Sequence, residues 1–225
     1  MHIPRTPHRW RLTASQAVAV QFRFAQRVVR EGDGRPLRRI AGLDAAFYGS
    51  TCVAAVVLWD MERRAVQEQR VASHPLWFPY VPGLLSFREA PALLAALRKL
   101  EGAPDALMCD GQGIAHPRRF GIASHLGVLT GLPSIGCAKS RLLGDARTPG
   151  PARGDTAPLT DRDEVVGAVV RTRSNTRPVY VSIGHLVDLP VAVALVLAAT
   201  TGFRLPEPTR LADRLVAAAK RKLRE

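Results

Sequence analysis

Long apolar runs are absent from this 225-residue sequence, and no stretch approaches the roughly 18 consecutive apolar residues that a membrane-spanning helix requires. The first ten residues, MHIPRTPHRW, also lack the apolar segment that characterises a secretory signal peptide. These two absences argue against a membrane-embedded or exported protein. We therefore expect a cytoplasmic protein.

Cysteine and aromatic residues are both scarce. The three cysteines, Cys52, Cys109 and Cys137, are odd in number, lie in apolar runs and form no CxxC pair. This excludes a disulfide framework and a zinc pattern, and it predicts buried, reduced thiols. Aromatic residues make up 6% of the chain against 47% hydrophobic residues, which predicts a core of Ala, Val and Leu. The length fits one globular domain, residues 1–225.

Acidic residues are outnumbered by basic ones, 19 against 32, which gives a formal net charge of +13. A surface of this sign attracts polyanions such as nucleic acid or an anionic membrane. Arg greatly outnumbers Lys, and the planar guanidinium suits bidentate contacts with phosphate. A solvated Arg-rich surface without a polyanionic partner is the alternative interpretation of the charge alone.

The hydrophobic pattern predicts an α/β domain whose sheet begins antiparallel and continues parallel. Three strands separated by short turns form the antiparallel part, at 39–47, 52–60 and 65–73. Helices and strands then alternate, at 86–100, 106–109, 122–130 and 134–137, and strands follow at 164–171 and 179–182. A capping box of Thr13 and Gln16 opens a helix to about Arg30, and helices are expected at 190–200 and near the C-terminus. Segment 144–163, rich in Gly, Pro, Asp and Thr, is predicted to be a mobile surface loop.

Three separated carboxylates suggest metal chemistry. Asp44 interrupts the apolar strand IAGLDAAF, where it must face solvent, pair with a cation or bind a metal. Asp110 ends the apolar run ALMC before a glycine turn, the arrangement found at the ligand edge of an open sheet. Glu89 lies in the first turn of a helix, where the helix dipole alone also favours an acid. If the three converge, they suit Mg²⁺ and the hydrolysis of phosphodiesters.

Other polar residues also stand at the ends of predicted strands. His185 follows a glycine and is a metal ligand, a proton donor or a hydrogen-bonded core histidine. Lys139 is placed to hold a phosphate or to lie in solvent. The glycines of DGQG make a tight turn or allow close approach of a ligand, with His116 and Arg118 in the same loop.

Four longer segments, FPYVPGLLSFRE, CDGQGIAHPRRFGIASHLGV, LPSIGCAKSRLLG and FRLPEPTRLAD, resemble the endonuclease V family, as do IAGLDAAF and VSIGH. They follow the family's order and cover most of the chain from Ile40 to Asp213. The resemblance implies an RNase H-like fold, a mixed five-stranded sheet flanked by helices. It further implies recognition of hypoxanthine and hydrolysis of the second phosphodiester bond on its 3′ side. The cofactor is Mg²⁺, with Mn²⁺ as a substitute, and the products carry 3′-hydroxyl and 5′-phosphate ends.

The family's functional residues map onto this chain by motif. Asp44, Glu89 and Asp110 match its metal-binding acids, His185 its active-site histidine and Lys139 a lysine near the scissile bond. The lesion-binding residues are then the wedge PYVP and the base pocket, namely Tyr80, Pro82, Leu85, Gly111, Gln112, Gly113, His116 and Ile122.

Three positions depart from the pattern. Leu186 stands where many members carry Arg, Phe203 where Tyr is frequent, and Gln112 where His or Asn is common. Gln keeps both a donor and an acceptor, and none of the departures removes an expected metal ligand.

The expected partner is DNA containing deoxyinosine, with inosine-containing RNA as the alternative substrate, and we expect a monomer. Two other functions compete. Another RNase H-like nuclease would share Asp44 and Asp110 but has no use for PYVP or DGQG. A non-catalytic nucleic-acid-binding module with a decayed site is disfavoured by the intact Asp44, Glu89, Asp110 and His185.

Overall fold

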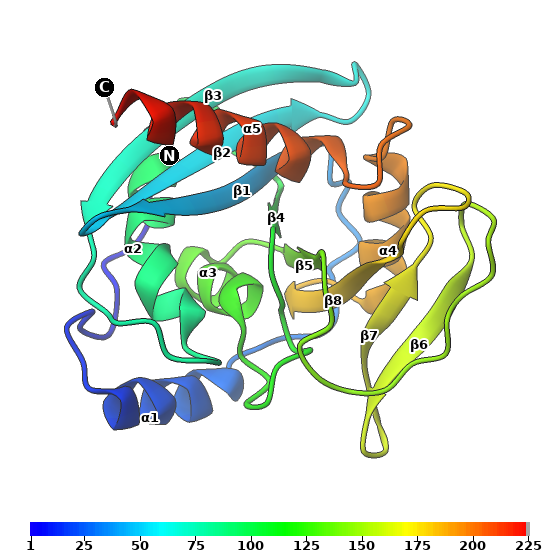
Figure 1. The fold of residues 1–225 in the computed structure, drawn as a ribbon, viewed down its shortest axis with the longest axis horizontal. Helices are drawn as coiled ribbons and strands as arrows, with labels where there is room; N and C mark the ends of the chain where they lie inside the picture. The colour runs from blue at the N-terminus through cyan, green and yellow to red at the C-terminus, as the bar shows by residue number, and fades with distance from the viewer. Residues whose placement is uncertain (224–225) are drawn as a thin grey trace.

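A computed structural model describes residues 1–223, and its strands form one mixed sheet of eight in the order β3-β2-β1-β4-β5-β8-β7-β6 (Figure 1). The strands are β1 (Arg39–Tyr48), β2 (Thr51–Asp60), β3 (Ala65–Pro75), β4 (Ala106–Cys109), β5 (Ser134–Ala138), β6 (Thr156–Asp161), β7 (Glu164–Val170) and β8 (Val179–His185). The helices are α1 (Ala14–Ala25), α2 (Leu85–Arg98), α3 (Ile122–Thr130), α4 (Leu189–Ala198) and α5 (Glu207–Lys222).

The α/β class and the change from antiparallel to parallel pairing are confirmed. Strands β1, β2 and β3 pair antiparallel, whereas β4 pairs parallel with both β1 and β5. A two-residue turn joins β1 to β2, a connection that fixes the register of a hairpin. The carboxyl ends of β4 and β5 therefore meet at one edge, and that of β4 lies beside the middle of β1.

The expected count of five strands is wrong, because β8, β7 and β6 extend the sheet beyond β5. The expected loop at 144–163 contains β6, which pairs antiparallel with β7. Alternation places Ala157 and Leu159 inward, while Pro158 between them is exposed. Proline is tolerated on an edge strand because the missing N–H faces away from the sheet. The proline-rich composition therefore concealed a strand.

Helix α1 opens with the predicted capping box but ends at Ala25 rather than near Arg30. The following residues leave the helix because they bond to the end of β8. The Val29 carbonyl accepts from Leu186 N–H at 2.7 Å, and Val29 N–H donates to His185 Nδ1 at 3.1 Å. The sheet thus determines where the helix stops.

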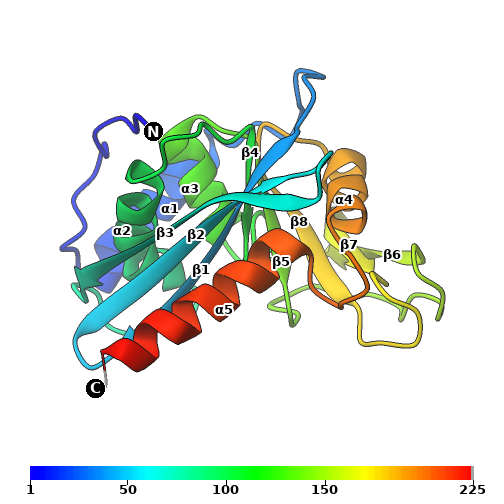
Figure 2. The same ribbon diagram turned by 90° about the horizontal axis from the view of Figure 1, so that it is seen from above.

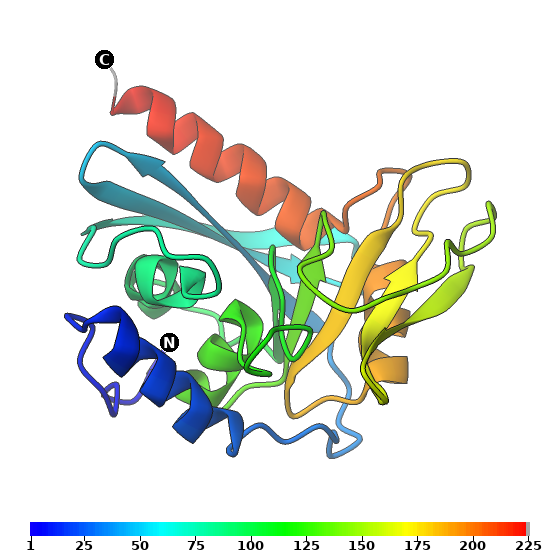
Figure 3. The same ribbon diagram turned by 60° about the horizontal axis from the view of Figure 1, so that its bottom comes forward.

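Helices cover both faces of the sheet (Figure 2). Helices α2 and α3 lie on one face, with α1 beyond them, and α5 crosses β1 and β2 on the other (Figures 2 and 3). Gly42 permits this crossing, because a Cβ there would lie 2.1 Å from the backbone of Pro208. The first turn of α5 is therefore seated directly on β1. No helix within residues 1–223 is long and apolar enough to cross a membrane.

Candidate active site

Three aspartates meet beside the centre of the sheet. Asp44 from β1, Asp110 from the end of β4 and Asp213 from α5 each offer a carboxylate oxygen, and these atoms lie within 4.8 Å of one another. The register explains the first pair, because Leu43 aligns with Cys109 in the parallel ladder and the next residues emerge together. Because α5 packs directly on Gly42, it places Asp213 next to the other two aspartates.

Lys139, which follows β5, lies against this cluster. Its Nζ is 2.5 Å from Asp110 Oδ2 and 3.1 Å from Asp213 Oδ1. Burial alone would lower the pKa of Lys139, but hydrogen bonds and charge attraction to Asp110 and Asp213 raise it above its ordinary range. The ammonium group thus compensates part of the negative charge of the aspartates.

Glu89 lies on the second turn of α2 and not in the first turn as expected, because the helix begins at Leu85; it interacts with this charge but is outside the group of three. Burial, followed by the charges of Asp44 and Asp110, raises the pKa of Glu89 to about 8. Burial and the charge of Asp110 raise the pKa of Asp44 to about 7. Carboxyls whose ionised forms are disfavoured in this way are stabilised by an added cation. Oxygen donors of this kind fit a hard divalent ion.

A cavity of about 390 Å³ opens beside the cluster, with Asp110 and Lys139 in its wall. It also contains most of the residues predicted to bind the lesion, namely Tyr80, Pro82, Leu85, Gly111, Gln112, His116 and Ile122. Tyr80 is 71% exposed, the position expected of a side chain that contacts a macromolecule. Gly113 does not line the cavity; a Cβ there would lie 1.9 Å from the Ile183 carbonyl, so this glycine serves packing against β8.

The cavity has a rigid polar wall. His116 accepts from Arg118 N–H through Nδ1 at 3.2 Å and meets the Gly83 carbonyl through Nε2 at 2.9 Å. Since a carbonyl only accepts, Nε2 carries the proton and the ring is neutral. Burial lowers the pKa of His116 to about 4, which agrees with that form. Both ring nitrogens are occupied, so His116 holds the PYVPG segment in place.

Hydrogen-bonding groups remain available along the same wall. Gln112 Nε2 donates to the Ser140 carbonyl at 3.0 Å, while its Oε1 is buried without a partner in residues 1–223. Helix α2 starts at Leu85 without a side-chain cap; Phe87 N–H donates to the Leu84 carbonyl, which leaves the N–H groups of Leu85 and Ser86 without a capping side chain. A helix N-terminus of this kind favours an oxygen acceptor on a ligand.

The structure places His185 apart from the three aspartates and Lys139. It ends β8, which runs antiparallel to β5, and it pairs with Ser134 at the start of that strand. Lys139 follows the other end of β5, so about five residues of extended chain, roughly 17 Å, separate the two positions. The Nδ1 of His185 accepts from Val29 N–H, which makes this side chain part of the scaffold.

Asp213 is the acid that sequence interpretation missed. It ends the segment FRLPEPTRLAD and lies one helical turn after Thr209, a buried residue on the sheet-facing side of α5. That spacing predicts a carboxylate at the margin of the buried face. The sequence pattern contained this information, but the contact with Asp44 depends on how α5 is seated on β1.

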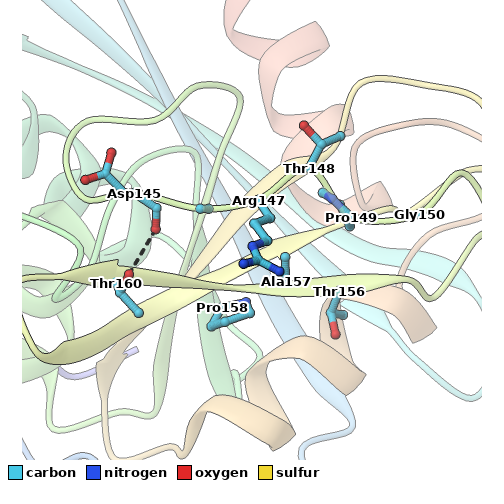
Figure 4. Close-up of a pocket in the computed structure, with 10 residues that line it drawn as sticks. Asp145, Arg147, Thr148, Pro149, Gly150, Thr156, Ala157, Pro158 and Thr160 are labelled. Atoms are coloured by element: carbon cyan, nitrogen blue, oxygen red, sulfur yellow. Dashed lines mark hydrogen bonds between the residues drawn. The ribbon is translucent and has the colours of Figure 1, made fainter.

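A larger hollow of about 680 Å³ lies between segment 145–150 and β6 at the far edge of the sheet (Figure 4). Asp145 and Thr160 bridge its two sides through their backbones (Figure 4). None of the residues predicted from sequence lines it. The smaller cavity beside the aspartates is therefore the better candidate for substrate binding.

Comparison with known proteins gives a consistent result. The sequence model of the family described as Endonuclease V matches residues 22–214. The Roseiflexus sp. (strain RS-1) protein named Endonuclease V is 52% identical over 206 residues, covering 92% of this chain and 93% of that protein. The crystal structure of Endonuclease V from Streptomyces avermitilis superposes with a TM-score of 0.92 at 45% identity, covering 98% and 99% of the two chains.

A more distant structure carries a ligand. Endonuclease V of Ciona intestinalis, in complex with a 24mer DNA containing an inosine followed by a ribo-adenosine, superposes with a TM-score of 0.82 at 25% identity. The superposition covers 93% of this chain and 98% of that one.

Proposed function

This chain belongs to the endonuclease V family, and on that premise we propose that it recognises deoxyinosine in DNA and hydrolyses the second phosphodiester bond on the 3′ side. The products carry 3′-hydroxyl and 5′-phosphate ends. The observation that carries the proposal is the junction of two features: three carboxylates within 4.8 Å of one another, and a base-sized cavity that shares Asp110 with them. The first suits phosphodiester chemistry and the second suits an extruded base.

The aspartates would hold the cofactor, for which we propose Mg²⁺ with Mn²⁺ as a substitute. The donor set is all oxygen, which matches Mg²⁺, an ion that keeps water and substrate phosphate oxygens in its shell. When bound, such an ion activates water and neutralises charge on the leaving oxygen. Glu89, whose carboxyl interacts with the charges of Asp44 and Asp110, would add a further acid to this site from α2.

Lys139 supplies a positive charge at the same place. Its Nζ lies against Asp110 and Asp213, where a scissile phosphate would also be drawn. A lysine acts on phosphate as a compact point charge with rotatable donors. Lys139 thus positions the phosphate against the acids.

The cavity wall explains the choice of base. Extrusion of a base costs a few kcal/mol and least at a weak pair, as inosine pairs are. Tyr80, exposed on the PYVP segment, fills the vacated stack and recovers about 1–3 kcal/mol. The uncapped first turn of α2, at Leu85, offers N–H donors to the purine O6, which adenine lacks. Gly111, Gln112 and Ile122 enclose the ring.

The inosine-containing DNA held by the Ciona intestinalis protein supports this choice of partner. The net charge of +13 supports attraction to a polyanion. We further infer that β1 to β5 correspond to an RNase H-like core, that the chain forms one domain and that it acts as a monomer.

Cleavage of labelled oligonucleotides tests the proposal. Duplexes with deoxyinosine or deoxyadenosine at one position are incubated with Mg²⁺ or with EDTA, beside single strands carrying inosine in DNA or RNA. A single Mg²⁺-dependent nick at the second 3′ bond, lost in Asp110→Asn and Asp213→Asn but kept in Asp60→Asn, is expected. Equal cutting of both duplexes would indicate a general nuclease. Binding without cutting would indicate a non-catalytic module, and cutting confined to the RNA strand would move the substrate to RNA.

A further inference from the structure

A buried chain of hydrogen bonds leads from the N-terminal segment to the wall of the base cavity. Ser86, on the first turn of α2, lines the cavity, and its Oγ lies 3.0 Å from His125 Nδ1. His125 Nε2 lies 2.9 Å from His8 Nε2. His8 Nδ1 then lies 2.8 Å from the carbonyl oxygen of Arg9. Whether each histidine nitrogen donates or accepts depends on the partner of the other nitrogen in the same ring.

The carbonyl at the outer end fixes the direction of the whole chain. A carbonyl only accepts, so His8 Nδ1 carries a proton, and in a neutral ring His8 Nε2 is then an acceptor. His125 Nε2 must therefore donate to it, which leaves His125 Nδ1 as an acceptor. The Ser86 hydroxyl consequently donates its hydrogen to His125. Only the lone pairs of Ser86 Oγ remain for a ligand.

The surroundings keep both rings neutral. His125 is fully buried, and the rings of Phe87 and Phe120 pack on it with centroids 5.1 Å away. Burial lowers the pKa of His125 well below its ordinary value, and burial also lowers that of His8, with Arg23 acting in the same direction. Neutral rings have one donor and one acceptor each, as the directional argument requires.

We propose that Ser86 is a specificity-determining residue whose oxygen accepts the ring N1–H of a deaminated purine, with His125 and His8 as positioning residues. This inference rests on the proposed function and names the atom that reads the base. Hypoxanthine presents an O6 acceptor beside an N1–H donor, whereas adenine presents an amino donor beside an N1 acceptor. The first turn of α2 offers the complement of hypoxanthine: amide N–H donors beside an oxygen that can only accept. Adenine would place its amino donor against the amide N–H donors and its N1 acceptor against Ser86 Oγ. Buried polar groups left unpaired in this way disfavour adenine strongly.

Ser86→Ala removes the acceptor and tests the contact directly. We expect kcat/KM on deoxyinosine duplexes to fall about tenfold, the usual effect of losing one buried hydrogen bond. Ser124→Ala is the matched control, because Ser124 is a buried serine on α3 whose Oγ has no partner within the described residues. That control should retain wild-type cutting and stability.

A modified base separates this contact from general damage to the pocket. Hypoxanthine methylated at N1 keeps O6 and N7 but has no N1–H to donate. The wild-type enzyme should cut it far less well than hypoxanthine, and Ser86→Ala should lose most of that preference. Equal preference in the two enzymes would overturn the role of Ser86.

His8→Ala tests the direction of the chain. Without His8, the His125 ring is free to carry its proton on Nδ1 and donate to Ser86, so the hydroxyl hydrogen can turn toward the cavity. Cutting at adenine relative to hypoxanthine should then rise several-fold, a change that lost stability alone does not produce. An unchanged ratio would overturn the positioning role. If the wild-type enzyme cuts no inosine substrate, the proposed function fails as a whole; if it cuts but Ser86→Ala behaves as wild type, only this inference fails.

Discussion

Replacing Asp44 with asparagine should stabilise the metal-free protein while abolishing cleavage. Burial, followed by the charge of Asp110, raises the pKa of Asp44 from its ordinary 3.8 to about 7. Its ionised form is therefore disfavoured in the folded protein relative to the unfolded chain. Asparagine keeps the shape of the side chain but carries no charge, so it removes that penalty together with the repulsion felt by Glu89.

The size of the effect follows from the two pKa values. The difference between about 7 and 3.8 corresponds to at most roughly 4 kcal/mol, at about 1.4 kcal/mol per tenfold change in proton affinity. Relaxation and water entry reduce such penalties, so we expect about 2–4 kcal/mol. For a chain of this size that is a rise in Tm of roughly 5–15 °C.

The Tm advantage of Asp44→Asn should increase with pH. Because the folded pKa of Asp44 is raised, its penalty is absent below the ordinary value of 3.8 and grows as the pH rises toward about 7. The Tm advantage of Asp44→Asn should therefore be negligible near pH 4 and reach its full size by about pH 8. Thermal unfolding in EDTA, followed by circular dichroism across this range, measures it.

Two comparisons sharpen the experiment. Asp60→Asn should show the opposite trend, because backbone N–H donation from Arg63 leads the contacts that lower the pKa of Asp60. Adding Mg²⁺ at pH 8 should raise the Tm of the wild-type protein more than that of Asp44→Asn, since a ligand stabilises the state that binds it. A variant at Asp44 that is less stable than wild type at pH 8 in EDTA would refute the electrostatic reasoning.

Three further predictions follow from the site. Tyr80→Ala should weaken binding to a deoxyinosine duplex by about 5- to 100-fold and binding to undamaged duplex much less, as measured by fluorescence anisotropy; equal losses would reject the wedge role. Lys139→Ala should slow cutting yet tighten Mg²⁺ binding in calorimetry without DNA, because its ammonium competes for the carboxylates; weaker binding would show that Lys139 assists the ion. His185→Ala should keep cutting close to wild type but lower the Tm, because the Val29 N–H loses its acceptor; loss of cutting in a stable variant would restore His185 to the active site.

Some of this site could be predicted from the sequence for a simple reason. Local periodicity identifies β1 and β4, and parallel pairing of two strands places the residues that follow in register together, as with Asp44 and Asp110. The PYVP segment lies between β3 and α2, the DGQG segment follows β4, and the structure brings both to one cavity.

The remainder depends on long-range geometry. Asp213 joins the other acids because α5 packs on Gly42, and His185 lies away from Lys139 because β8 runs antiparallel to β5. The edge position of β6 decides whether Pro158 is acceptable in a strand. The chain from His8 to Ser86 joins segments whose proximity no periodic pattern encodes.

The contact between Gly42 and Pro208 has a consequence for how the enzyme matures. Its acids come from positions 44, 110 and 213, so the last of them is synthesised long after the sheet that receives it. A chain that ends before α5 lacks one of the three carboxylates of the site. Docking of the last helix on β1 therefore completes the group of three acids.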